Sequence, residues 1–63
     1  MNREMFIKRY DSAFIALVTE KDLETYNLGY TCALLSMGLV TGIITLQECL
    51  FLSHARDAVM ERR

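Results

Sequence analysis

Few residues of this 63-residue chain could perform chemistry, and they lie near its C-terminal end. His54 is the only histidine, with Ser53 before it and Asp57 three residues after it. Neighbouring residues on a helix project about 100° apart, so Ser53 and His54 are poorly placed as nucleophile and base. Asp57 could orient the imidazole, but a triad would still need a nucleophile from elsewhere. We therefore predict a helix-surface histidine paired with Asp57, no catalytic residue and no enzyme activity.

A metal or cofactor site has equally little support. Cys32, Cys49 and His54 would have to converge with a fourth ligand, and structural zinc sites usually contain pairs such as CxxC. The glycines are scattered and form no phosphate-binding loop. We predict no metal and no cofactor. With no export signal apparent at the N-terminus, the cytoplasm is the expected compartment, and each cysteine is interpreted as a small buried hydrophobe with a reduced thiol.

The charge balance argues against a nucleic-acid-binding protein without excluding one. The chain has seven basic and eight acidic residues and a net charge of −1, whereas phosphate-binding proteins usually present a basic face. A local basic patch could form only if both ends of the chain met, from Arg3, Lys8, Arg9, Arg56, Arg62 and Arg63. Carboxylates alternate with these residues, which favours an ordinary solvated surface. A small DNA-binding regulator remains an alternative.

The composition indicates an ordered helical chain. It is 52% hydrophobic, contains no proline and has only three glycines, which disfavours both disorder and a disulfide scaffold. A chain of this length buries only about 60% of its unfolded surface, so its own core is marginal. We predict one small all-α domain over residues 1–63 that gains stability from a second subunit.

Helical spacing of Phe6, Tyr10 and Leu17 predicts an N-terminal helix over about residues 2–18, with Asn2 as its N-cap. After this segment, the apolar residues no longer continue the same helical face. We expect a break near residues 19–21 and a new helix capped by Thr19, although one continuous helix is the alternative.

The centre of the chain predicts a helical hairpin. A second helix over about residues 20–37 should end at Gly38 as a C-cap glycine. Thr45 and Glu48 have the spacing of a capping box, which predicts a last helix over about residues 46–60.

Residues 25–47 carry no charge, which also permits a single membrane span. Gly38 and Gly42 form a GxxxG sequence of the sort that packs membrane helices. The polar residues within this run and the two helix-boundary signals at its centre favour the hairpin.

More apolar surface is predicted than one small core can cover. Six consecutive apolar residues occupy positions 13–18, and the last helix is apolar on more than one side. A large exposed apolar patch is normally an interface. We predict a homodimer that acts by binding another protein, with an interface formed by Phe14, Ile15, Leu17, Val18, Phe51, Leu52, Ala55 and Ala58.

The whole chain, from Met1-Asn2-Arg3-Glu4-Met5-Phe6 through the segment 39–45 (LVTGIIT) to Glu61-Arg62-Arg63, resembles the 63-residue protein encoded in the exo–xis region of lambda-like bacteriophages. The resemblance rests on length and overall appearance, because it includes no functional motif. It implies an early, non-essential phage protein in the bacterial cytoplasm, linked to host takeover and to the choice between lysis and lysogeny. It implies no catalytic residues.

Overall fold

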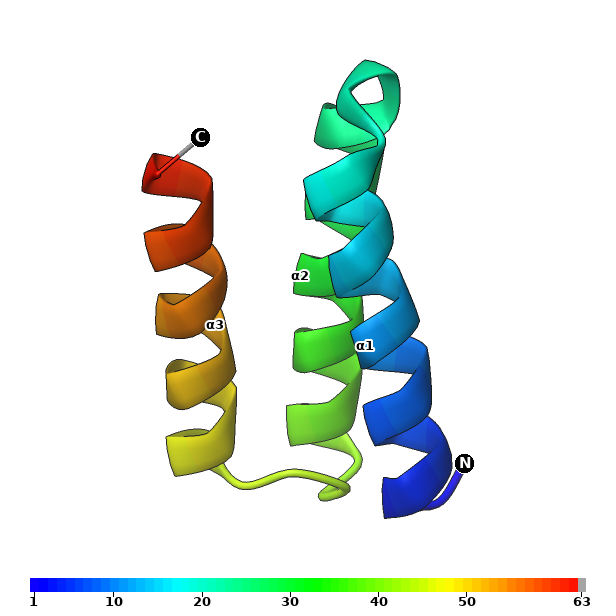
Figure 1. Cartoon of the computed structure of the whole chain (residues 1–63). Coiled ribbons are helices and arrows are strands. Elements are labelled where there is room, and N and C mark those ends of the chain that lie inside the picture. The colour runs from blue at the N-terminus through cyan, green and yellow to red at the C-terminus, as the bar shows by residue number, and fades with distance from the viewer. Residues whose placement is uncertain (63) are drawn as a thin grey trace.

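The computed structural model of the protein describes residues 1–62, and these form an all-α fold. The helices are α1 (Arg3–Thr19), α2 (Glu24–Val40) and α3 (Leu46–Glu61), with a short 3-10 turn, η1 (Lys21–Leu23), between the first two. α2 runs antiparallel to both of its neighbours in sequence, so α1 and α3 point in the same direction (Figure 1). The predicted helical hairpin with an attached N-terminal helix is confirmed.

α1 begins and packs as its sequence predicts. The Asn2 Oδ1 atom accepts a hydrogen bond of 2.8 Å from the backbone N–H of Met5, which caps the helix. Phe6, Tyr10 and Leu17 lie on the buried face of this helix. The spacing of three and four residues therefore identifies the side of α1 that faces the other helices.

The break after α1 is present, but the predicted cap at Thr19 is wrong. Thr19 is the last residue of α1, and its hydroxyl donates a 2.8 Å hydrogen bond to the carbonyl of Ile15 instead of capping a new helix. Glu20 leaves the helical conformation at φ −105° and ψ 82°. α2 starts at Glu24 after η1, with no side-chain cap, so the first two helices are separate.

The predicted C-cap at Gly38 is also wrong. α2 continues to Val40, and Gly38 is a buried residue within it. Gly42 is the residue with a left-handed backbone, at φ +79°, and its N–H donates to the carbonyl of Leu39 at 3.2 Å. Gly42 therefore ends the helix in the way predicted for Gly38.

The capping box at the start of α3 is confirmed. The Glu48 backbone N–H donates to the Thr45 hydroxyl at 3.1 Å, and the Thr45 backbone N–H donates to the Glu48 carboxylate at 2.9 Å. Both orphan donors are satisfied reciprocally. α3 consequently begins at Leu46, as predicted.

The long uncharged run is divided by a turn rather than forming one element. It comprises nearly all of α2, the connection over residues 41–45 and the first residues of α3. Within residues 1–62, no helix has both the length and the hydropathy needed to cross a bilayer.

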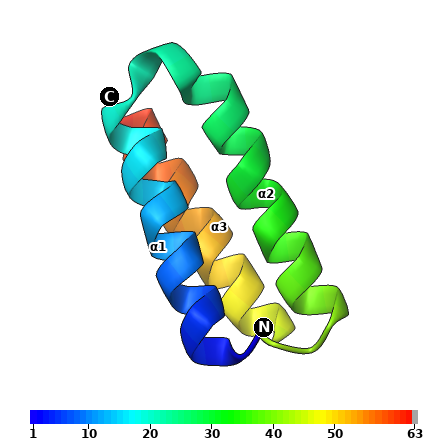
Figure 2. The same ribbon diagram turned by 90° about the vertical axis from the view of Figure 1, so that its right-hand side faces the viewer.

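The core lies between the three helices, whose arrangement Figure 2 shows from a second side. Phe6, Tyr10 and Ala13 of α1 pack against Leu34 and Leu35 of α2. Ile44 joins them from the α2–α3 connection, and Leu52 of α3 packs against the cluster while remaining partly buried. α1 packs chiefly against α2, and its backbone approaches that of α3 closely at fewer positions.

Candidate protein-binding groove

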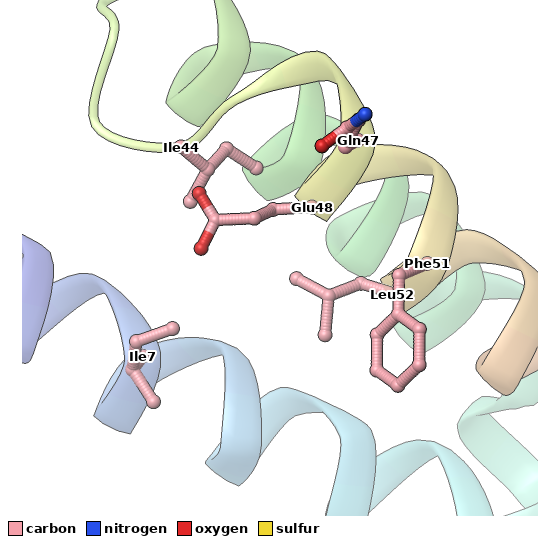
Figure 3. Close-up of a pocket in the computed structure, with 6 residues that line it drawn as sticks. All are labelled: Ile7, Ile44, Gln47, Glu48, Phe51 and Leu52. Atoms are coloured by element: carbon pink, nitrogen blue, oxygen red, sulfur yellow. The ribbon is translucent and has the colours of Figure 1, made fainter.

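An apolar groove runs between α1 and α3. Its first hollow, of about 340 Å³, is lined by Ile7, Ile44, Gln47, Glu48, Phe51 and Leu52 (Figure 3). A second hollow, of about 200 Å³, shares Ile7 and Leu52 and continues along the two helices to Tyr10, Asp11, Phe14 and Ala55. The shared residues make the two hollows one continuous surface, which we call the α1–α3 groove.

The groove stays open because the residues facing it come from two parallel helices that do not fully interlock. Ile7 of α1 lies across the hollow from Glu48 and Leu52 (Figure 3). Phe51 on the α3 side is 72% exposed although it is a large aromatic residue. A phenylalanine left this exposed beside an apolar hollow is typical of a surface that a partner covers.

An ion pair stands at the N-terminal end of the groove. Arg3 of α1 forms two hydrogen bonds with the Glu48 carboxylate of α3, one of them 2.9 Å long from Nη1 to Oε1. This hydrogen bonding with Arg3, together with that from the Thr45 backbone, lowers the pKa of Glu48 to about 2. Glu48 thus both caps α3 and ties the start of α3 to the start of α1.

Four of the residues predicted to form the interface line this groove: Phe14, Phe51, Leu52 and Ala55. Ala58 is exposed on α3 one helical turn beyond Ala55, and Val18 is half-buried one turn beyond Phe14 on α1. Ile15 is exposed, but it does not line either hollow. The sequence pattern therefore located part of the apolar lining on both helices, and its use as an interface stays a prediction.

The prediction of Leu17 as an interface residue has to be corrected. Leu17 has no exposed surface and is one of the largest fully buried side chains, so in this structure it belongs to the interior and not to an interface. The six-residue apolar run surrounds the helix, and only the packing of the other helices decides which of its members remain outside. Leu17 continues the buried stripe of Phe6, Tyr10 and Ala13.

A buried arginine between α2 and α3 was not predicted as a structural residue. Arg56 is 8% exposed, and its Nη1 atom donates to the Cys32 sulfur at 3.2 Å and to the Thr31 hydroxyl at 3.5 Å. Its Nε atom donates to Asp57 at 3.1 Å. Burial acts to lower the pKa of Arg56, but the hydrogen bond to Asp57 and nearby negative charge outweigh it and raise this pKa, so the guanidinium stays charged. No signal in the sequence distinguished this arginine from a surface residue.

The basic residues do not assemble into one patch. Arg3 lies at the N-terminal end of α1 and Arg62 follows the C-terminal end of α3, at opposite ends of the bundle (Figure 1). Arg56 is buried, and Lys8 pairs with Glu4 at 3.5 Å. Arg63, the remaining member of the predicted patch, lies outside the described residues.

The residues considered for catalysis and metal binding are dispersed. His54 is exposed on α3, and the hydrogen-bonded partner of Asp57 is Arg56, not His54. Cys32 is exposed on α2 and Cys49 is half-buried on α3, and both are free thiols. The expectation of a buried Cys32 is thus wrong, since the residue is exposed although its sulfur accepts a hydrogen bond from Arg56.

Comparisons with protein families, with curated proteins and with solved structures give no match for this chain. The interpretation of the α1–α3 groove therefore rests on its geometry and chemistry.

Proposed function

We propose that this chain is a non-enzymatic protein that acts as a homodimer and binds another protein in the α1–α3 groove. The observation that carries the proposal is the continuous apolar lining of the groove beside the 72% exposed ring of Phe51. Covering an aromatic side chain of this kind removes a large apolar area from water, which is the main favourable term in most protein associations.

The chemistry of the lining indicates what the partner should offer. Ile7, Phe14 and Leu52 would receive apolar side chains, while Asp11 and Gln47 at the margins would make polar contacts. An interface with an apolar centre and a polar rim is the usual arrangement in protein–protein complexes.

The resemblance to exo–xis region proteins of lambda-like phages supports a biological setting for this binding. We propose an early phage factor that works in the cytoplasm of the infected bacterium. By binding a host or phage protein, it would influence host takeover and the decision between lysis and lysogeny.

Substitution of Phe51 tests the proposal. Phe51→Ser removes the exposed ring, and Val40→Ser is a matched control because Val40 is 85% exposed and lines neither hollow of the groove. We expect a protein from infected bacteria that is retained by the wild type and by Val40→Ser but lost with Phe51→Ser. Retention that does not depend on Phe51, with folding of all three proteins verified by circular dichroism, would contradict the proposal.

A further inference from the structure

A separate hollow, which is not part of the α1–α3 groove, lies between α1 and α2. It encloses about 500 Å³ and is lined by Arg9, Ser12 and Ala16 of α1, by Glu20 directly after that helix, and by Tyr26 and Tyr30 of α2, among others. We call this surface the α1–α2 face. Tyr26 is 70% exposed here and Tyr30 is 39% exposed, so the face carries two uncovered aromatic rings.

The α1 side of this face permits another helix to approach closely. Ser12 and Ala16 lie one turn apart at its centre, and both have small side chains. Small residues let two helix axes come nearer than the usual 8–10 Å range allows for large side chains. The flanking tyrosines could then pack over an incoming helix from the side.

The charges at the two ends of the face identify which helix would fit. Arg9 and Thr19, the last residue of α1, are ten residues or roughly 15 Å apart along the helix, and Glu20 directly follows Thr19. Neither Arg9 nor Glu20 forms a salt bridge within residues 1–62. An antiparallel copy of α1 would bring each Arg9 opposite the Glu20 of the other chain, whereas a parallel copy would oppose like charges.

The face also contains a buried polar group that has no hydrogen-bond partner within the described residues. Asn27 lines the hollow and is only 5% exposed, and its Nδ2 atom has no hydrogen-bond acceptor in the described part of the chain. A buried donor without an acceptor is costly, so polar atoms entering this hollow would be favoured over purely apolar ones.

From these observations we infer that a second copy of this chain docks on the α1–α2 face, with the two α1 helices antiparallel and reciprocal Arg9–Glu20 pairs at both ends. The interface is isologous, since each copy supplies the arginine of one pair and the glutamate of the other. The inference rests on the homodimer of the proposed function but not on the α1–α3 groove. Both grooves remain uncovered in this dimer, so one dimer offers two partner sites.

Charge reversal tests this arrangement, with dimer dissociation constants measured by sedimentation equilibrium. Arg9→Glu or Glu20→Arg alone puts like charges opposite each other at both ends and should weaken the dimer roughly tenfold or more. The double variant Arg9→Glu/Glu20→Arg restores opposite charges and should recover wild-type affinity. An equimolar mixture of the two single variants should form a heterodimer, because every facing pair is then attractive.

The controls separate this inference from the proposed function. Arg9 and Glu20 are both exposed, so circular dichroism of the single variants should match the wild type. Asp11→Arg reverses a charge on the groove side of α1 and should leave the dimer unchanged. Dimers insensitive to Arg9 and Glu20, or sensitive to Asp11 instead, would overturn the inference and leave the homodimer intact. A wild-type monomer at high micromolar concentration would overturn both.

Discussion

Substitution of each of the three glycines by alanine should change the stability of the fold differently. Close packing requires glycine at one position, a left-handed backbone requires it at another, and nothing requires it at the third. An alanine Cβ at Gly38 would lie 2.7 and 2.8 Å from two ring atoms of Phe6 and 3.1 Å from Ile44 Cγ1. Phe6 is completely buried and cannot turn away. Overpacking of this kind costs about 1–3 kcal/mol, and the better helix propensity of alanine returns less than about 1 kcal/mol. We expect a net loss of roughly 1–2 kcal/mol for Gly38→Ala.

Gly42 and Gly29 provide the comparison. A Cβ at Gly42 meets no atom within 4 Å, but the backbone there has φ +79°. A left-handed conformation costs an L-residue about 1–2 kcal/mol, so Gly42→Ala should also destabilise the fold. Gly29 lies inside α2 and is exposed, with nothing within 4 Å of an added Cβ. Gly29→Ala should therefore stabilise the protein by about 0.5–1 kcal/mol.

Thermal unfolding followed by circular dichroism at one fixed protein concentration would measure the series. Each 1 kcal/mol corresponds to a shift of about 4–8 °C in Tm for a chain of this size. Chemical synthesis with D-alanine at position 42 tests the cause of the second loss, since D-alanine accepts positive φ and should recover the stability that Gly42→Ala loses. A Gly38→Ala protein as stable as Gly29→Ala would refute the close packing of α2 against Phe6. An unchanged Tm for Gly42→Ala would refute the left-handed end of α2.

Three further predictions concern polar residues. Glu48→Gln keeps a side chain that can complete the capping box but removes the charge that faces Arg3. Because the pKa of Glu48 is lowered from 4.5 to about 2, its contribution is fully present above pH 4.5 and lost as the pH falls through 2, so urea midpoints of wild type and variant should converge over that range. Asn27→Leu should raise the free energy of unfolding of the monomer by about 1 kcal/mol, measured by urea titration at a concentration where the chain is monomeric, since it removes a donor that has no acceptor within the chain; a loss would show that the amide is satisfied there. Arg56→Ala should cost about 2–4 kcal/mol, whereas Arg56→Met should stay within about 1.5 kcal/mol of the wild type, because methionine refills the space and no desolvated charge remains. Equal losses for these two variants would show that the guanidinium itself is required.

The sequence predicted those parts of the fold that depend on local chemistry. Asn2 and the Thr45–Glu48 box cap their helices as expected, because side chains and backbone groups within one turn suffice to make these contacts. The apolar spacing of α1 identified its buried face for the same reason, since helical periodicity is a local property.

The errors occur where a distant contact decides the conformation. Gly38 and Gly42 both follow an apolar helical stripe, and only the approach of Phe6 shows that Gly38 is needed for close packing while Gly42 ends the helix. The Thr19 error is different, because the competing hydrogen bond is local: its hydroxyl donates to the Ile15 carbonyl one turn back in α1.

The α1–α3 groove was likewise predictable in its local features and unpredictable in those that depend on tertiary packing. The apolar excess of α1 and α3 was evident from their sequences, but the burial of Leu17 and the exposure of Phe51 depend on how the helices are arranged. The α1–α2 face was not predicted, because its charges and tyrosines come from two helices whose pairing is a tertiary feature.

Site-specific photo-crosslinking in infected bacteria tests most directly whether the protein uses the α1–α3 groove to bind a partner. A benzoylphenylalanine would replace Phe51 in the groove, Tyr26 on the α1–α2 face or the exposed Val40 as a background position. We predict a cross-link from position 51 to a different protein, a cross-link from position 26 to a second copy of this chain, and neither from position 40. If the cross-linker at position 51 gives no more product than the one at position 40, the proposal that the α1–α3 groove binds a partner is contradicted.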